Sequence, residues 1–381
     1  MIAGGSVLTP TYALPAADRP SPPRRHRLEG LDAMRGVAVL MVLGAHFNLT
    51  APLSTAPWLN GVLLHWQASG WSGVDLFFVL SGFLISSLLF REHAAHGRVR
   101  VGRFLLRRGL KIYPSFWVMV LFTVCAMLAT GHPVQPAELL SELLFVQNYG
   151  PSLYNYTWSL AVEEHFYLLL VGLIVWLGTR DHDVRGVLRV ALFTLPAVLV
   201  ARFVSVWVWP EWYRIHVSYT HLRLDGLAFG VALGYVAVFY GDALEHWVRQ
   251  WRWVLLIASG LLCVSLAGVP QRSPWLFTVG LSTLYLGAGS LLLLARYSPF
   301  ALGLSGLVAP LAWVGANSYA IYLWHVPVRQ WGGGLLAWLT GQEAPTVGGL
   351  LLYVLGAVLF GAFMTRMVER PALAWRDRHV P

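Results

Sequence analysis

The chain alternates long apolar runs with short polar stretches. A helix that crosses a bilayer needs about 20 mostly apolar residues, and runs of that length recur along the whole sequence. They predict ten spans, near residues 32–50, 71–90, 111–130, 158–178, 187–208, 219–240, 252–269, 275–295, 308–330 and 347–366. The predicted fold is therefore an all-α integral membrane protein.

The polar stretches between these runs are short, which predicts one membrane domain over residues 28–371. Residues 1–27 contain five prolines and no long apolar core. That composition is typical of a disordered tail and not of a signal peptide. We expect residues 372–381 to form a second short tail, on the same side of the membrane.

Composition supports a membrane location. The chain is 57% hydrophobic and 12% charged, whereas a soluble domain carries about 25% charged residues. Cys125 and Cys263 both lie inside apolar runs, so we expect small core residues, and neither a disulfide framework nor a metal site.

The net charge of +9 could indicate a nucleic-acid partner, but the positions of the basic residues argue against one. With the N-terminus inside and each span reversing the side, all but five Lys and Arg fall on the inner side; the exceptions are Arg202, Arg214, Arg223, Arg272 and Arg329. Cytoplasmic loops carry such an excess. Both termini are therefore expected in the cytoplasm.

The first span contains two ionisable residues, Arg35 and His46. Eleven residues make about three helical turns, which places both side chains on one face, roughly 16 Å apart. A charge inside a bilayer is unfavourable by roughly 2.5–3.5 kcal/mol, so such residues are candidate functional groups. His46 can take a proton from a hydroxyl and return it, or it can simply hydrogen-bond a neighbouring helix.

Further polar residues are expected near the outer face. Asp75 follows the start of the second span, and Glu163 and Glu164 follow the start of the fourth. Consecutive helix positions diverge by about 100°, so we expect one glutamate to face the site and the other to face solvent. Gly73 and Gly82 would permit close helix contact.

Two pairs in later spans point to local contacts. Arg223 and Asp225 could form an ion pair that holds helices together near the outer face. Tyr322 and His325 are three residues apart and share a helix face.

A basic stretch over residues 98–111 precedes the third span. Within it, Arg107 and Arg108 lie four and three residues before Lys111, so their charges converge at the helix entrance. Such a cluster suits pyrophosphate and phosphate esters. Attraction to anionic lipid explains it equally well.

Seven segments, in order, resemble acyltransferase family 3, whose members include envelope-polysaccharide acetylases and macrolide acyltransferases. They read LDAMRGVAVLMVLGAHF, GVDLFFVLSGFLIS, FLLRRGLKIYP, WSLAVEEHFYLL, RLDGLAFGVALG, SYAIYLWHVPV and VERPA. The family's Arg, ten residues, His pattern falls on Arg35 and His46. Its basic pair falls on Arg108 and Lys111, where lysine is a departure because it lacks the bidentate geometry of arginine.

The resemblance implies transfer of an acetyl or short acyl group from acyl-CoA to a hydroxyl of a sugar, glycan or glycosylated natural product. Acetyl-CoA is the expected donor substrate, and no permanently bound cofactor or metal is expected. The implied location is a bacterial inner membrane. The identity of the acceptor stays open.

The resemblance also implies a division of roles among the candidate residues. The donor phosphates would be held at the inner face by Arg35, Arg107, Arg108 and Lys111. His46 would be the general base, oriented by Glu163 or Glu164, with Asp75 as an alternative. The acceptor mouth would be lined by Trp158, Arg223, Tyr322, Trp324 and His325.

Two other classes of function stay open at this point. Intramembrane charges and prolines within the spans also suit a transporter or flippase for a lipid-linked or small product. A related protein could also keep the fold for sensing or scaffolding. The intact Arg35, His46 and glutamate pair favour the enzyme.

Overall fold

The computed structural model describes residues 24–47, 57–178, 184–264, 273–297, 305–334 and 346–380. Every regular element in these ranges is a helix. Of the first expected tail, residues 1–23 lie outside the described residues, whereas the first helix already begins at Arg24. The expected C-terminal tail is largely helical, because the last helix runs from Arg370 to His379.

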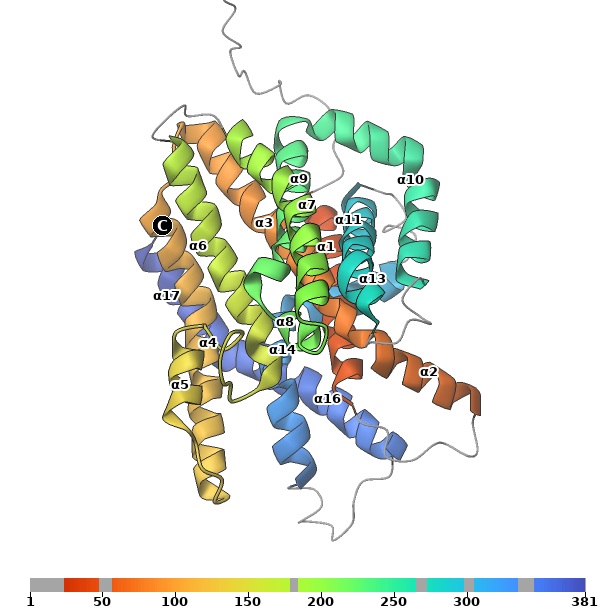
Figure 1. Cartoon of the computed structure of the whole chain (residues 1–381). Helices are drawn as coiled ribbons and strands as arrows, with labels where there is room; N and C mark the ends of the chain where they lie inside the picture. Colours follow the sequence, from red (N-terminus) through yellow and green to blue (C-terminus); the bar gives the residue numbers. More distant parts are fainter. Residues whose placement is uncertain are drawn as a thin grey trace, which may run out of the picture.

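In the described ranges, fourteen α-helices of eight residues or more carry the fold (Figure 1). They are α1 (Arg24–Ala45), α2 (Pro57–Ser69), α3 (Gly73–His96), α4 (Val101–Ala129), α5 (Pro136–Leu143), α6 (Trp158–Gly178), α7 (Arg185–Val208), α9 (Leu224–Phe239), α10 (Gly241–Val264), α11 (Leu281–Tyr297), α13 (Ser305–Ala316), α14 (Ser318–Pro327), α16 (Thr346–Met364) and α17 (Arg370–His379). Shorter helical elements include α8 (Tyr213–His216), η2 (Asn155–Thr157), η5 (Val328–Gly332) and η6 (Thr365–Glu369).

The protein is a multi-pass helical membrane protein, and each predicted span coincides with helix over most of the residues that the structure describes. By length and apolarity, however, six described segments qualify as spans, or seven if α9 and α10 are counted as one span bent by 111°. The predicted count of ten is therefore not confirmed. Charged residues reduce the apolar length of α1, and the run at 308–330 is broken between α13 and α14.

Helix α3 lies at the centre of the packing. It contacts α9, α1 and α11, while α1 also packs on α13 and α14 packs on α16 (Figure 1). The expected close contacts at Gly73 and Gly82 are confirmed, because a Cβ atom there would collide with the carbonyl oxygens of Ala38 and Leu227. These contacts fix the position of α3 against α1 and α9.

The outward faces of the helices are apolar, as a lipid environment requires. Leu121 and Phe122 of α4 are exposed, and so is Cys125. The expectation that Cys125 is a core residue is therefore wrong, because in a membrane helix an apolar run faces lipid as readily as core. The side chain of Cys263 lies outside the described residues.

Candidate functional site

Two cavities meet inside the helix bundle. The first, about 140 Å³ in volume, is lined by Arg35, Arg108 and Lys111, and we term it the basic cavity. The second, about 540 Å³, is lined by His46 and several aromatic residues, and we term it the histidine cavity. Val74 and Tyr322 line both. Arg35, in the middle of α1, and His46, directly after its end, thus border two adjoining cavities.

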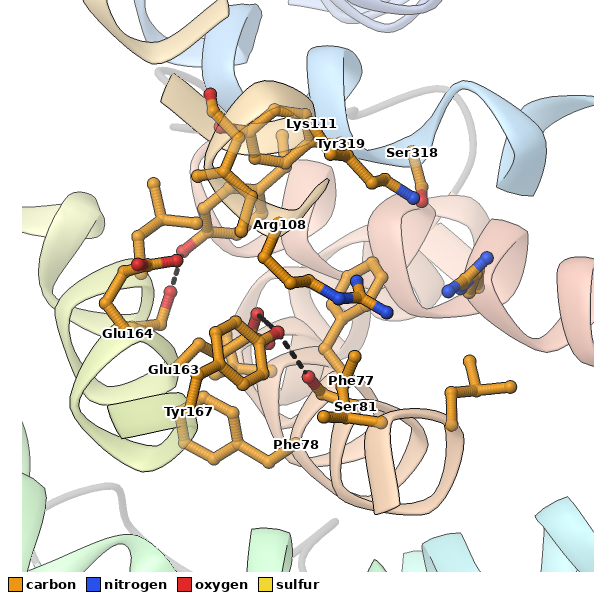
Figure 2. Close-up of a pocket in the computed structure, with 18 of the residues that line it drawn as sticks. Phe77, Phe78, Ser81, Arg108, Lys111, Glu163, Glu164, Tyr167, Ser318 and Tyr319 are labelled. Carbon is orange, nitrogen blue, oxygen red and sulfur yellow. Dashed lines mark hydrogen bonds between the residues drawn. The ribbon is translucent and has the colours of Figure 1, made fainter. Parts of the chain in front are cut away.

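Three cations border the basic cavity. Arg108 and Lys111 reach it from α4 and Arg35 reaches it from α1, so the expected convergence of Arg108 and Lys111 is confirmed (Figure 2). Arg35 forms an ion pair of 3.1 Å with Asp32. In the part of the chain that the structure describes, neither Arg108 nor Lys111 has a carboxylate within 4.0 Å. Arg108 and Lys111 can therefore each bind an anion that enters the cavity.

Arg107 does not join this group. Its guanidinium forms a 3.0 Å ion pair with Asp377 of α17 and donates to the carbonyl of Val380. Arg107 therefore does not line the basic cavity with the other cations expected to hold the donor, because adjacent helix residues point about 100° apart. Its contacts join α17 to α4.

Glu163 and Glu164 both line the basic cavity and not the histidine cavity. Glu163 accepts a hydrogen bond of 3.0 Å from Tyr167 (Figure 2). Glu164 accepts one of 2.9 Å from Tyr113. Because Tyr167 donates to Glu163, the hydroxyl of Ser81, at 2.7 Å, donates to Tyr167.

This placement overturns two expectations about the glutamates. They were expected at the outer mouth beside His46, with only one facing the site. Glu163 lies five residues into α6, about 7.5 Å below its start, which is deep enough to reach the basic cavity. The cavity extends between α3 and α4, so it receives both side chains despite their divergence.

His46 follows the last residue of α1 and lines the histidine cavity. Its Nδ1 lies 3.0 Å from the carbonyl oxygen of Val42. Since a carbonyl can only accept, the neutral ring carries its proton on Nδ1, and Nε2 keeps a lone pair. The backbone therefore holds His46 in the tautomer that a general base needs.

His325 packs against His46. The two ring centroids are 4.7 Å apart, and the ring of Tyr156 is also 4.7 Å from His325. His325 is fully buried and does not line either cavity. His325 is therefore not at the cavity wall where an acceptor-binding residue was expected, because Tyr156 and His46 pack against its ring. The predicted shared face is confirmed, since the Tyr322 and His325 rings are 5.6 Å apart.

Trp158 and Tyr322 line the histidine cavity as expected. Trp324 does not. Its ring lies 5.2 Å from that of Phe122 and 5.1 Å from that of Phe360, on the other side of α14. It is a core residue between α4 and α16, because only one face of a helix can border a cavity.

Arg223 also lines the histidine cavity. The expectation that it forms an ion pair with Asp225 is wrong. It forms a buried ion pair of 2.9 Å with Asp75, whereas Asp225 pairs with Arg202 at 2.5 Å. Residues two apart at a helix start point to different sides, so Arg223 reaches α3 and Asp225 reaches α7. Asp75 is thereby bound to Arg223 and is 4% exposed.

Several site residues escaped the sequence reasoning. Ser81 and Tyr167 looked like ordinary residues of apolar spans, and Ser159 gave no signal. Glu369 lines the basic cavity although it is far from the others in sequence; its place in the closing VERPA segment was the available signal. Arg202 could have been suspected as an isolated charge within an apolar run.

Outside the spans, Glu142 of α5 supports the segment that carries the aromatic wall. Its carboxylate accepts a 2.9 Å hydrogen bond from Thr157, next to Trp158. Burial raises the pKa of Glu142 to about 7. This contact ties the connection before α6 to α5.

Known proteins resemble this chain over most of its length. A family model described as an acyltransferase domain, that of acyltransferase family 3, matches residues 28–366. The peptidoglycan O-acetyltransferase OatA of Listeria monocytogenes is 27% identical over 377 residues, covering 91% of this chain and 56% of that protein.

Two further relatives are similar to this chain over comparable lengths. A putative peptidoglycan O-acetyltransferase, YrhL of Bacillus subtilis, is 29% identical over 332 residues (80% of this chain, 49% of that protein). The O-acetyltransferase OatA of Staphylococcus aureus is 27% identical over 329 residues (79% and 50%). The chain thus spans about half the length of these relatives. No solved structure matches.

Proposed function

We propose that this chain, which belongs to acyltransferase family 3, moves an acetyl or short acyl group from acyl-CoA to a hydroxyl of a glycan. Its relatives are named as O-acetyltransferases, two of them for peptidoglycan. Membership in an acyltransferase family sets aside the transporter and scaffold interpretations. The donor, the acceptor and the roles of the individual residues are what we propose.

One observation carries it: the cavity lined by Arg35, Arg108 and Lys111 adjoins the cavity that contains His46, and both are lined by Val74 and Tyr322. Arg108, Lys111 and Arg35 suit the phosphates of coenzyme A, because guanidinium and ammonium groups bind phosphate esters by charge-assisted hydrogen bonds. The pantetheine arm would then direct the thioester towards the shared boundary.

In the proposed reaction, His46 Nε2 takes the proton from the acceptor hydroxyl as its oxygen attacks the thioester carbonyl. Collapse of the tetrahedral intermediate forms the ester and expels the thiolate of coenzyme A, which takes the proton back from His46. General base catalysis of this kind contributes about 10²–10⁴-fold. The ring is regenerated neutral, ready for the next acceptor.

The carboxylates take different roles from those expected. Glu163 holds Tyr167 at the wall of the basic cavity, Glu164 holds Tyr113 of α4, and Asp75 neutralises Arg223. We therefore assign none of the three as the partner of His46. The backbone carbonyl of Val42 takes that orienting role.

The acceptor we propose is a carbohydrate. The rings of Trp158 and Tyr322 and the polar side chains of Gln67 and Arg223 line one cavity, a combination that offers apolar faces to a sugar ring and hydrogen bonds to its hydroxyls. Peptidoglycan is the first acceptor to test, because two relatives are named for it.

We further propose that the basic cavity faces the cytoplasm of a bacterium, with both termini on that side of the inner membrane. The excess of Lys and Arg in the inner loops supports this orientation. It also supports an even number of membrane crossings, for which ten is our proposal.

The test is acyl transfer by purified protein in detergent or vesicles, with labelled acetyl-CoA and peptidoglycan fragments. His46→Ala should lower turnover by about 10²–10⁴-fold, whereas His65→Ala, at an exposed position of α2, should not. Normal turnover of a folded His46→Ala protein would remove His46 from the mechanism.

Donor binding has its own control, because Arg107 and Arg108 are neighbours with different surroundings. Coenzyme A should bind more weakly to Arg35→Ala, Arg108→Ala and Lys111→Ala, and with unchanged affinity to Arg107→Ala, whose side chain faces Asp377. If all four variants bound coenzyme A with equal affinity, attraction to anionic lipid would explain the basic stretch better than donor binding.

A further inference from the structure

Val74 and Tyr322 are the two residues that line both cavities. We propose that they form a neck that limits the length of the acyl group. The proposal rests on the function proposed above, because it requires a thioester in the basic cavity and an acceptor in the histidine cavity. It assigns the choice between acetyl and longer acyl groups to this pair.

The basic cavity changes character along its length. Its cations come from α1 and α4, whereas the wall contributed by α3 next to Val74 is apolar, with Phe77 and Phe78. These two rings lie one turn along α3 from Val74. In this proposal, a donor whose phosphates meet the cations extends its acyl end towards Val74, Phe77 and Phe78.

Aromatic contacts narrow the passage at the boundary. The ring of Phe77 lies 6.2 Å from that of Tyr322, and Phe78 lies 5.9 Å from Trp158, both edge to face. Trp158 belongs to the histidine cavity, so each pair joins one wall to the other. Every methylene added to the acyl group must fit between these rings.

Tyr322 is fixed in place by its hydroxyl. The hydroxyl donates to the carbonyl of Tyr156 at 2.7 Å and accepts from Ser159 at 2.6 Å. Two hydrogen bonds to different residues prevent the ring from swinging away without leaving buried polar groups unsatisfied. The aromatic side of the neck therefore has a set position.

The opposite side of the neck is also fixed. Val74 follows Gly73, whose backbone packs directly against the Ala38 carbonyl of α1. Helix α3 thus cannot move closer to α1 to make room for a longer acyl group. The width of the neck depends on the Val74 side chain itself, which makes it the position to test.

The experiment measures coenzyme A release from acetyl-, propionyl-, butyryl- and hexanoyl-CoA, with peptidoglycan fragments as acceptor. Val74→Ala should raise the ratio of butyryl to acetyl kcat/KM about tenfold, since one methylene in an apolar pocket changes selectivity by about 10–200-fold. Val74→Ile should lower that ratio. Tyr322→Phe, which keeps the ring but loses both hydrogen bonds, should raise it.

Val79→Ala is the matched control. Val79 is a buried valine of the same helix that lines neither cavity, so the same change there can lower stability without altering the ratio of thioesters. A purely structural effect would change the rates with all donors by the same factor and leave that ratio unchanged.

The outcomes separate the two proposals. Acetyl transfer by the wild type, with the same donor ratio in Val74→Ala, Val74→Ile and Val79→Ala, overturns the neck and leaves the proposed function standing. No turnover of any thioester by the folded wild type overturns both. A ratio that shifts in opposite directions in the two Val74 variants supports the neck.

Discussion

His46 and His325 face each other edge to face, with ring centroids 4.7 Å apart. Only His46 reaches a cavity, while His325 is enclosed by protein. The carbonyl of Tyr322, 2.5 Å from Nδ1, sets the orientation of the second ring. From this contact we expect His325 to position the ring of His46.

Replacing His325 should therefore impair the reaction without affecting the donor site. We expect His325→Ala to lower kcat about tenfold, less than the loss of about 10²–10⁴-fold for removal of a general base. The affinity for coenzyme A should stay unchanged, because the basic cavity is elsewhere. Steady-state kinetics and a binding measurement on one preparation provide the comparison, and a weaker affinity with unchanged kcat would contradict this role.

The ion pair between Asp75 and Arg223 gives a prediction about stability. Removing one member of a buried pair leaves an uncompensated charge and is unfavourable by about 3–5 kcal/mol. Asp75→Leu alone should therefore lower the melting temperature strongly in detergent. The double variant Asp75→Leu with Arg223→Met should recover much of the loss. A double variant less stable than either single variant would show that the two residues do not act on stability as a pair.

Glu142 makes stability depend on pH. Its pKa rises from 4.5 to about 7 on folding, so between these values the folded state holds a proton that the unfolded state has lost. Stability is therefore highest below about pH 4.5, falls as the pH rises, and levels off above about pH 7. Glu142→Gln should flatten this dependence. Melting curves from pH 5 to 8 check it, and parallel profiles for the two proteins would contradict it.

The contact of α3 with α9 should tolerate no side chain at Gly82. A Cβ atom there meets the carbonyl oxygen of Leu227, so Gly82→Ala should destabilise the protein by about 1–3 kcal/mol through overpacking. Gly172→Ala is the control, because a Cβ atom at Gly172 meets nothing within 4 Å. Thermal melting of both variants provides the measurement. Equal melting temperatures would mean that α3 and α9 can move apart.

Local relationships were predictable from sequence, since they follow from helix geometry. Arg108 and Lys111 share a face because they are three residues apart, and Tyr322 and His325 do so for the same reason. The positions of the helices also followed from the apolar runs. The bend between α9 and α10 and the break before α14 did not, because hydropathy does not distinguish a bent segment from two spans.

Relationships between distant segments were beyond the sequence. Asp75 and Arg223 are 148 positions apart, and the nearer Asp225 was an equally charged partner for Arg223. The depth of Glu163 and Glu164 depends on how far α6 descends beside α4, and Glu369 reaches the basic cavity only because the chain returns to it at its end. Tertiary packing decided all three.

The shared boundary at Val74 and Tyr322 bears on the order in which substrates associate with the enzyme. In the proposed reaction, donor and acceptor occupy separate cavities, so neither must leave before the other enters, and a ternary complex can form from either side. The membrane barrier for the acyl group is then reduced to the thickness of two side chains. Charged coenzyme A stays in its own compartment, and only the uncharged acyl group crosses.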